Sequence, residues 1–486
     1  MKVSILHLSD LHRDLENEVD NTTLIESIKR DIDRFHLGSP QIQLPNICVV
    51  SGDLIYGVQI GREAFANEID RQYDQTLEFL KQLTTELFNG NPEKVVLIPG
   101  NHDICANTYR ASVSPVPTPA DSTDRRKLVT ELFRPHSPVR WSWRDLSFYK
   151  IDRPEIYDNR LQGFCRCYNA FYGNKRTYSV NPREQFDIFE FSELPLVIAG
   201  ISSCFENDLD NRAGGICPQA ISTLARELRN PKYDGILIGA TWHHSIFGGP
   251  RQDDFLDADV LQSLIDVGIS FGMSGHQHRS SFLDEYMKVG PSSRKLSILS
   301  ASTLCAGPGQ LSPGEPRGYN VIEIDLESLN GKLHQRRMLN QQFELPVWGP
   351  GSFVESGTSF IDFRVESPRG VQIRNRLLNT DLQAAERLVG DGSWAEAIAI
   401  LEDDSENALA RSLLLKAVTS SEDFPRMQAL FIPPRTVQEA IAAGGALVEH
   451  FNSDGAALFL ASELVKTSTD PNVGEITTRV KRRYNR

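Results

Sequence analysis

Residues 95–103 read Val-Val-Leu-Ile-Pro-Gly-Asn-His-Asp, a short apolar run that ends directly in a cluster of polar side chains. An aliphatic run of this length, bounded by Pro and Gly, predicts a buried strand from Val95 to Ile98. Asn101, His102 and Asp103 can bind a metal ion or transfer a proton. The stretch therefore predicts reactive chemistry at the end of a strand.

Four other predicted strands end in the same way. Asp10 and His12 follow Val3 to Leu8, Gly52 and Asp53 follow Ile47 to Val50, His243 and His244 follow Ile236 to Ala240, and Gly275, His276 and His278 follow Ile269 to Met273. Residues i and i+2 of an extended chain point to the same side, which predicts that each Asp-x-His or His-x-His pair converges on one centre. Because neighbours on a strand face opposite ways, only one histidine of the His243-His244 pair should reach a metal. A lone histidine or a single Gly-Asp turn has an ordinary structural explanation, but five such strand ends favour a metal site.

The elements between these strands define the fold class. Asn21 starts one predicted helix, and Arg62 to Phe88 form a second with apolar residues at helical spacing. Strands crossed over by helices predict an α/β domain. Further strands are expected at Leu196 to Gly200, Ile298 to Ala301, Tyr319 to Leu326 and Lys332 to Leu339, and this number requires two packed sheets.

The ordered motifs Asp-x-His, Gly-Asp, Gly-Asn-His-Asp, His and Gly-His-x-His resemble those of the calcineurin-like metallophosphoesterase superfamily, over about residues 1–345. The resemblance implies a four-layer α/β/β/α sandwich and a hydrolase that acts on phosphoric ester bonds. The forms at residues 9–12 and 100–103 look more like the phosphodiesterase and DNA-repair-nuclease branches than the protein Ser/Thr phosphatases. Those phosphatases usually continue the Gly-Asp motif with an Asp-Arg-Gly element, whereas this chain has Leu-Ile-Tyr-Gly at residues 54–57. The chain also departs from the nuclease branch, which often has Leu-Gly after its first histidine, because Arg13 and Asp14 follow His12 here.

The resemblance also implies a set of metal ligands. One metal ion would be held by Asp10, His12, Asp53 and His278, and a second by Asp53, Asn101, His243 and His276, with Asp53 as the bridge. Mixed nitrogen and oxygen ligands favour two Mn²⁺ ions, with Fe or Zn²⁺ as the alternatives. His102 lies outside the ligand set and would protonate the leaving oxygen, with Asp103 orienting its imidazole.

A long insert separates the motifs, at about residues 104–190. Residues 125–183 contain thirteen Lys and Arg residues against five acids, in a chain whose net charge is −13, and eleven aromatic residues. Interleaved cations and rings are typical of surfaces that bind a nucleotide or single-stranded nucleic acid. The residues expected to contact such a substrate are Arg140, Trp141, Trp143 and Arg144. A structural cap, with the aromatic residues as a small core, explains the composition equally well.

The Pro/Gly-rich stretch Leu345 to Ser352 is expected to end the catalytic domain, with residues 346–372 as a linker. Residues 373–486 predict an α-helical region. Within it, the pattern from Leu388 through Gly392 and Trp394 to Ala397 resembles the first helix of a tetratricopeptide repeat. A protein-binding module and an inert helical bundle are both compatible with this pattern.

The composition and the apolar runs of the chain limit what it can bind and where it can be located. The net charge of −13 over 486 residues argues against a protein that coats polyanions, although a local basic groove remains compatible. No apolar run approaches the length of a membrane span, and the N-terminus reaches polar residues too early for a signal peptide. We therefore expect a cytoplasmic protein with no membrane contact.

These observations favour a phosphodiesterase or nuclease that depends on two metal ions. One alternative is a phosphomonoesterase that acts on a small molecule or a phosphoprotein. Another is a non-catalytic scaffold that works through the C-terminal helices, against which the complete ligand set argues.

Overall fold

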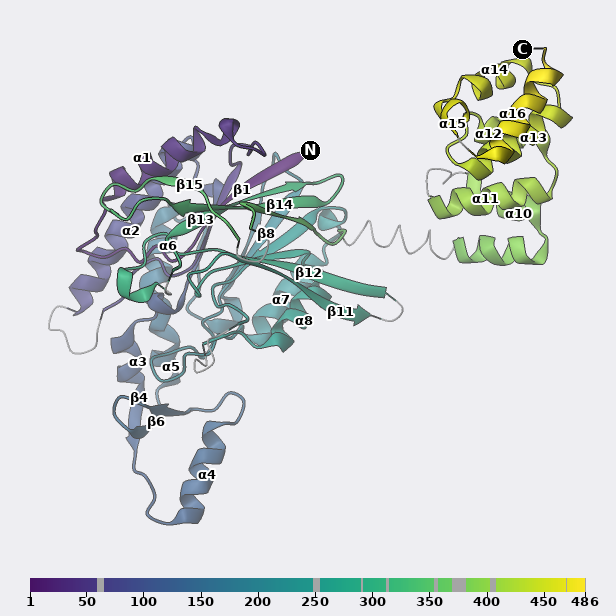
Figure 1. Ribbon diagram of the computed structural model, residues 1–486. Helices are drawn as coiled ribbons and strands as arrows, with labels where there is room; N and C mark the ends of the chain where they lie inside the picture. Colours follow the sequence, from purple (N-terminus) through teal and green to yellow (C-terminus); the bar gives the residue numbers. More distant parts are fainter. Residues whose placement is uncertain are drawn as a thin grey trace. The chain divides into compact units, whose positions relative to one another are not determined.

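The computed structural model describes residues 1–58, 65–247, 254–289, 292–311, 314–353, 357–368, 382–402, 408–468 and 470–485. The chain divides into two compact units, Met1–Gly370 and Val371–Arg486, which Figure 1 colours from purple to green and from green to yellow. Each unit has a hydrophobic core built from its own side chains. The division therefore follows the packing of the chain.

One β-sheet of the first unit contains the N-terminal strands. Its strand order is β15-β14-β13-β1-β2-β3, and β16 also pairs with β14. The strands are β1 (Lys2–Leu8), β2 (Ile47–Ser51), β3 (Val95–Ile98), β13 (Gly318–Asp325), β14 (Asn330–Met338), β15 (Trp348–Pro350) and β16 (Phe360–Arg364). β1, β2 and β3 run parallel and are buried on both faces, which explains why β2 and β3 are nearly continuous apolar runs.

The second sheet has the order β11-β12-β10-β9-β8-β7. Its strands are β7 (Phe186–Glu190), β8 (Leu196–Ile201), β9 (Leu237–Thr241), β10 (Phe271–Ser274), β11 (Ser281–Val289) and β12 (Ser292–Ser300). The two sheets approach closely where β3 faces β8. A Cβ atom at Gly200 would lie only 3.0 Å from the side chain of Ile98, so the glycine permits this approach.

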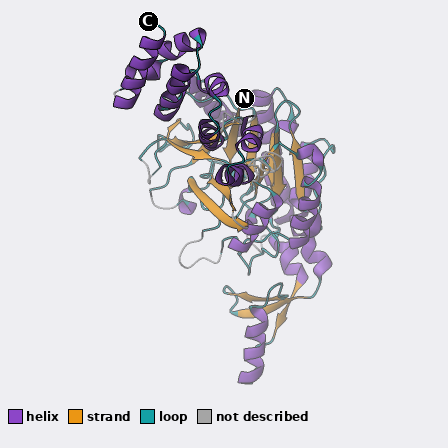
Figure 2. Cartoon of the chain, turned by 90° about the vertical axis from the view of Figure 1, so that its right-hand side faces the viewer, coloured by secondary structure: helices purple, strands orange, loops and turns teal. Residues whose placement is uncertain are grey.

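Helices cover the outer faces of both sheets (Figures 1 and 2). α1 (Asn21–Ile32), α2 (Phe65–Phe88) and α6 (Gln162–Phe171) bury apolar side chains in the core of the first sheet. α7 (Pro218–Leu228) and α8 (Ala258–Val267) pack on the second. The fold is therefore the expected four-layer α/β/β/α sandwich. The expected start of the second helix at Arg62 lies outside the described residues.

The insert forms a small subdomain at one end of the sandwich. A three-stranded sheet of order β4-β6-β5 and helix α4 project away from the main sheets in both views (Figures 1 and 2). The elements are α3 (Ala106–Ser112), β4 (Val113–Val116), α4 (Ser122–Leu132), β5 (Val139–Ser142), β6 (Ser147–Ile151) and α5 (Pro154–Tyr157). The second half of the insert returns to the sandwich as α6.

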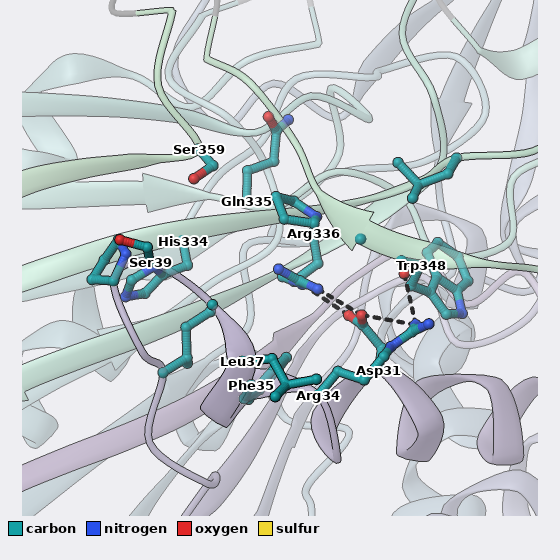
Figure 3. Close-up of a pocket in the computed structure, with 16 residues that line it drawn as sticks. Asp31, Arg34, Phe35, Leu37, Ser39, His334, Gln335, Arg336, Trp348 and Ser359 are labelled. Carbon is teal, nitrogen blue, oxygen red and sulfur yellow. Dashed lines mark hydrogen bonds and ion pairs between the residues drawn. The ribbon is translucent and has the colours of Figure 1, made fainter.

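The expected end of the catalytic domain near residue 345 is wrong. β15 and β16 extend the first sheet on β14, and the first unit runs to Gly370. Trp348 is only 1% exposed, and its indole Nε1 donates a hydrogen bond to Ser27 of α1 at 2.8 Å. Arg34 donates to the Trp348 carbonyl at 3.0 Å and lies beside the buried Asp31–Arg336 ion pair (Figure 3). Gly349 and Pro350 lie within the edge strand β15, so the Pro/Gly-rich composition of this stretch does not mark a linker.

The second unit is helical in its described residues. Residues 382–391 form a helix, followed by α10 (Trp394–Leu401), α11 (Ala408–Ser420), α12 (Phe424–Phe431), α13 (Val437–Glu449), α14 (Ser453–Ala461), α15 (Glu463–Thr467) and α16 (Pro471–Arg483). Gly392 has a φ of +80° and lies between two helices. The pattern from Leu388 to Ala397 therefore covers the end of one helix, the turn at Gly392 and the start of α10. Its assignment to a single helix is wrong. Within the described residues, no helix is long and apolar enough to cross a membrane.

Candidate metal centre

The strand ends singled out in the sequence meet at one edge of the two sheets. Loops after β1 and β2 are joined by a hydrogen bond from the Asp10 amide to the Gly52 carbonyl at 3.1 Å. On the second sheet, the Gly275 amide donates to the His243 carbonyl at 3.0 Å. The His276 amide, 3.2 Å from Asp10 Oδ2, connects the two sheets. The carboxyl ends of the parallel strands thus bring their loops to one place.

Asp10, His12 and His278 form one group of ligand atoms. Their atoms all lie within 4.8 Å of one another. His278 Nε2 is 3.2 Å from Asp10 Oδ1 and 3.3 Å from His12 Nε2. Asp10 and His12 are buried, and the side chain of His278 is 12% exposed. The group is a partly closed cluster of two nitrogens and one oxygen.

Asp53, His243 and His276 form a second group, within the same 4.8 Å limit. His243 Nε2 lies 3.2 Å from Asp53 Oδ2 and 3.0 Å from Asn101 Oδ1. His276 Nδ1 lies 2.9 Å from the same Asn101 oxygen. Asp53 Oδ2 is also 3.9 Å from His12 Nε2, which places this carboxylate between the two groups.

The neighbouring His244 faces away from the cluster. Its Nδ1 lies 2.8 Å from the Ser203 hydroxyl, and its Nε2 lies 3.3 Å from the side-chain amide of Asn207. Burial lowers the pKa of His244 well below its usual value, so the imidazole is neutral. Of the pair, only His243 lies among the clustered ligand atoms.

Most of these side chains are on residues whose backbone conformation differs from the extended one expected. Asp10, His12, Asp53, His276 and His278 all have positive φ angles, between 40° and 74°. They are therefore not extended, so the strand geometry behind the i and i+2 argument is wrong, although Asp10 and His12 do lie in one group as expected. His276 and His278, two residues apart, accordingly lie in different groups. A left-handed conformation costs a non-glycine residue about 1–3 kcal/mol, and such strain collects at functional sites.

Two glycines make room for the cluster. A Cβ atom at Gly52 would lie 2.5 Å from Nδ1 of His243, and one at Gly100 would overlap the carboxylate of Asp53. Gly52 also has a φ of +94°, which L-amino acids rarely adopt. The Gly-Asp and Gly-Asn-His-Asp motifs therefore need their glycines for steric reasons.

The electrostatics and unsatisfied atoms of the cluster fit bound cations. Although burial opposes its charge, the Asp53 carboxylate raises the pKa of His243 to about 9. Burial lowers the pKa of His12 to about 3, which leaves its imidazole neutral. Asp10 Oδ1 is buried without a hydrogen-bond partner. A metal ion would displace the proton from His243, because only a neutral imidazole can be a ligand. Imidazole nitrogens, carboxylates and an amide oxygen that converge in this way are a suitable donor set for two divalent transition-metal ions.

His102 lies beside both groups. Its ring is 4.6 Å from that of His12, and it forms a further set of ligand-distance atoms with His12 and Asp53. Its backbone amide donates to Asp53 Oδ1 at 2.8 Å, and its Nδ1 lies 2.7 Å from the carbonyl oxygen of Tyr56. Because a carbonyl can only accept, Nδ1 carries the proton and Nε2 faces the cluster.

The expectation that Asp103 orients this imidazole is wrong. The Asp103 carboxylate accepts hydrogen bonds from the amides of Gly100 and Leu54, at 2.8 and 3.2 Å, and from the Tyr73 hydroxyl at 3.1 Å. It is buried, and burial together with the nearby Asp53 charge raises its pKa to about 7. Asp103 therefore holds the Gly100–Asp103 turn in place, whereas the Tyr56 carbonyl orients His102.

Backbone carbonyls hold two of the clustered imidazoles as well. His243 Nδ1 lies 2.8 Å from the Ser51 carbonyl oxygen, and His278 Nδ1 lies 2.9 Å from that of Gln310. His276 differs, because its Nε2 lies 3.4 Å from the carboxylate of Asp254. Sequence analysis did not identify Asp254 or Tyr56. An acid in the stretch between His244 and α8 was the only available signal for Asp254, and a main-chain contact leaves no signal in the sequence.

The four residues expected to contact substrate have different environments. Arg140 is 5% exposed, and its guanidinium donates to Asp208 at 2.8 Å and to the Tyr157 hydroxyl at 3.2 Å, so its assignment to substrate binding is wrong. Trp143 is 80% exposed, and its ring lies 5.9 Å from that of Trp141. Arg144 is exposed and pairs with Asp145 at 3.1 Å. Five aromatic residues of the insert are instead part of the sandwich core: Phe164, Tyr168, Phe171, Tyr172 and Tyr178.

The fold and this cluster agree with the comparison to known families. The family model described as calcineurin-like phosphoesterase matches residues 3–280, and the chain belongs to this family. The family hydrolyses phosphoester bonds and depends on two metal ions. No curated protein matches the chain.

The solved structures that match the chain share little sequence with it. A dimetal phosphatase from Danio rerio is 10% identical, with a TM-score of 0.37, over 75% of this chain and 99% of that one. The calcineurin-like phosphoesterase YfkN from Bacillus subtilis is 12% identical, with a TM-score of 0.30, over 76% and 93%. A mutant of Vps29 from Entamoeba histolytica is 9% identical, with a TM-score of 0.26, over 74% and 100%.

Proposed function

We propose that this protein is a phosphodiesterase that uses two divalent metal ions, with Mn²⁺ favoured, and that its substrates are nucleic acids or nucleotides. Asp10, His12, Asp53 and His278 hold one ion, and Asp53, Asn101, His243 and His276 hold the other. The observation that carries the proposal is the convergence of these seven side chains beside His102. When bound, two such ions lower the pKa of a shared water molecule and stabilise negative charge on phosphoryl oxygens.

The chain's own residues supply orientation and a proton. Asp53 accepts from the His102 amide through Oδ1, which fixes its other oxygen between the two ligand groups. The Tyr56 carbonyl holds Nδ1–H of His102, so Nε2 is the atom that can carry a proton to the leaving oxygen. General acid catalysis of this kind contributes a factor of about 10² to 10⁴.

The exposed Trp143 and the partly buried Trp141 of the insert support a substrate that carries bases. Trp143 is largely open to solvent, Trp141 packs against it edge to face, and Arg144 is close by in the sequence. A base stacked on an aromatic side chain is worth about 1–3 kcal/mol. The buried Arg140 and the core aromatic residues take no part in this argument.

A panel of substrates tests the proposal. Protein supplied with Mn²⁺ should hydrolyse bis-p-nitrophenyl phosphate faster than p-nitrophenyl phosphate, and it should cleave single-stranded DNA or RNA. Fe²⁺ and Zn²⁺ in parallel reactions identify the preferred metal. A preference for the monoester would contradict the diesterase assignment and favour a phosphomonoesterase, and inactivity on all substrates with every metal would favour a scaffold.

A further inference from the structure

Asp254 contacts the candidate metal centre from outside both groups of ligand atoms. Its Oδ2 lies 3.4 Å from Nε2 of His276, and the two side chains are 17% and 10% exposed. An aspartate carboxyl is ordinarily ionised at neutral pH, so Asp254 places a negative charge at the outer edge of one imidazole.

The two ring nitrogens of His276 face different groups. Nδ1 of the ring faces the cluster, 2.9 Å from Asn101 Oδ1 and 3.3 Å from His243 Nε2. Nε2 then points outward, where it is buried, and the Asp254 carboxylate 3.4 Å away is the acidic group that faces it. A neutral imidazole carries one proton, and a carboxylate opposite Nε2 favours the tautomer whose lone pair is on Nδ1.

Asp254 differs from the outer partners of the neighbouring imidazoles. His102, His243 and His278 face backbone carbonyl oxygens, which are neutral. A carboxylate in the same place fixes the ring orientation and also makes the imidazole a stronger donor toward a metal ion. Asp254 is in none of the groups of candidate ligand atoms within the described residues, so it acts through His276.

We propose that Asp254 is a positioning residue for the metal ion bound by Asp53, Asn101, His243 and His276. Its carboxylate accepts the Nε2–H of His276 and presents Nδ1 to the ion. This inference rests on the two-metal site proposed above and adds a residue that neither the motifs nor the ligand groups contain. Loss of such an outer partner typically lowers metal affinity by about 10- to 100-fold.

Calorimetric titration of the metal-free, full-length protein with Mn²⁺ tests this role. Wild-type protein should bind two ions. Asp254→Ala should weaken one of the two binding events by about 10- to 100-fold and leave the other unchanged. Asp254→Asn should lie between them, because its amide oxygen still accepts the Nε2–H but carries no charge.

Asp257→Asn is the matched control. Asp257 caps α8 through the Asp259 amide, and asparagine is an equally good cap, so this variant should bind Mn²⁺ as the wild type does. Thermal unfolding of the metal-free variants checks that each is folded. Wild-type affinity for both ions in Asp254→Ala and Asp254→Asn would overturn the proposal.

A double-mutant cycle with His276→Ala tests whether Asp254 acts through His276. Removing the carboxylate should have no further effect on Mn²⁺ affinity once the imidazole is absent. An equal loss in both backgrounds would show that Asp254 acts elsewhere and would overturn the positioning role. Failure of the wild type to bind two ions would instead overturn the metal centre itself, and with it this inference.

Discussion

Five of the seven side chains assigned as metal ligands are on residues with left-handed backbone conformations. This conformation is unfavourable for Asp and His, and it is held here by hydrogen bonds between loops, such as that from the His12 amide to the Asp53 carbonyl at 3.0 Å. The strain is local, whereas the support comes from strands far apart in the sequence. The sheets therefore fix the ligand geometry before any ion binds.

Asp53 is the residue whose charge serves both ligand groups. Asp53→Asn should remove at least one bound ion and most of the activity, while the circular dichroism spectrum and the unfolding midpoint stay close to those of the wild type. Metal content measured by elemental analysis, together with turnover of bis-p-nitrophenyl phosphate, checks this prediction. Asp70→Asn, which alters an exposed ion pair with Arg166, is the control. An Asp53→Asn protein with two ions and full activity would contradict the bridging role.

Substitution of His102 distinguishes a role in proton transfer from a role in metal binding. His102→Ala should retain two metal ions but lose about 10²- to 10⁴-fold in turnover, because Nε2 no longer supplies a proton to the leaving oxygen. His136→Ala, which removes an exposed imidazole paired with Glu206, should leave turnover unchanged. If His102→Ala loses metal, His102 is a ligand, as its distances to His12 and Asp53 permit.

The residues of the site could be predicted from the sequence, but their local geometry could not. Polar residues at strand ends identified every side chain of the two groups because the carboxyl ends of parallel strands share one edge. The left-handed turns were missed because no residue type marks them at Asp10 or His276. Asp254 and the Tyr56 carbonyl were missed because the first lies outside every motif and the second is a main-chain atom.

At the scale of elements, the insert divides into a part that packs and a part that is exposed. Helix α6 and the segment after it bury Phe164, Tyr168 and Tyr172 in the core of the sandwich. The hairpin of β5 and β6 leaves Trp143 exposed. Composition alone cannot distinguish aromatic residues of the core from exposed ones, because burial depends on the fold and not on the residue type.

Replacing Trp141, Trp143 and Arg144 together by Ala should raise the Michaelis constant for single-stranded DNA or RNA and leave hydrolysis of bis-p-nitrophenyl phosphate unchanged. The reason is that stacking and phosphate contacts act on a polymer and not on a small diester. Steady-state kinetics on both substrates measure the difference. Equal losses on both substrates would indicate that the hairpin is a structural cap.

Arg140→Ala is a contrasting variant within the same hairpin. It leaves the Asp208 carboxylate buried without its cation, which is strongly destabilising, by about 3–5 kcal/mol. We therefore expect a lower unfolding midpoint in a thermal melt. An unchanged midpoint would show that the Arg140–Asp208 contact contributes little to the fold.

At the scale of the whole molecule, the boundary of the first unit is set by edge strands rather than by composition. β15 and β16 complete the sheet on β14, and the Trp348 ring packs on Tyr319 with ring centres 5.6 Å apart. The alternation of strands and helices was sufficient to predict an α/β domain with two packed sheets, and the resemblance of the motifs to the metallophosphoesterase family implied the four layers. The short edge strands were not predicted, because a Pro/Gly-rich strand of three residues has the composition of a loop.

A chain that ends at Gly370 should be soluble, bind metal and hydrolyse bis-p-nitrophenyl phosphate at the wild-type rate, because every described ligand precedes that point. A chain that ends at Leu345 should unfold more readily, since it loses both edge strands and the buried Trp348, whose side chain alone is worth about 3–5 kcal/mol. Thermal unfolding of the two truncated proteins measures this difference. Equal stability would contradict the boundary at residue 370, and loss of metal from the longer one would assign the helical unit to the catalytic core.

The central claim is that two metal ions in this cluster activate the protein as a phosphoesterase. Its most direct test is the rate of bis-p-nitrophenyl phosphate hydrolysis as Mn²⁺ is added to the chelated, full-length protein. We predict no hydrolysis without metal, and a rate that rises with added Mn²⁺ and levels off when two ions are bound per chain. Hydrolysis that is equally fast in the chelated protein would contradict the claim, as would a protein that binds no Mn²⁺.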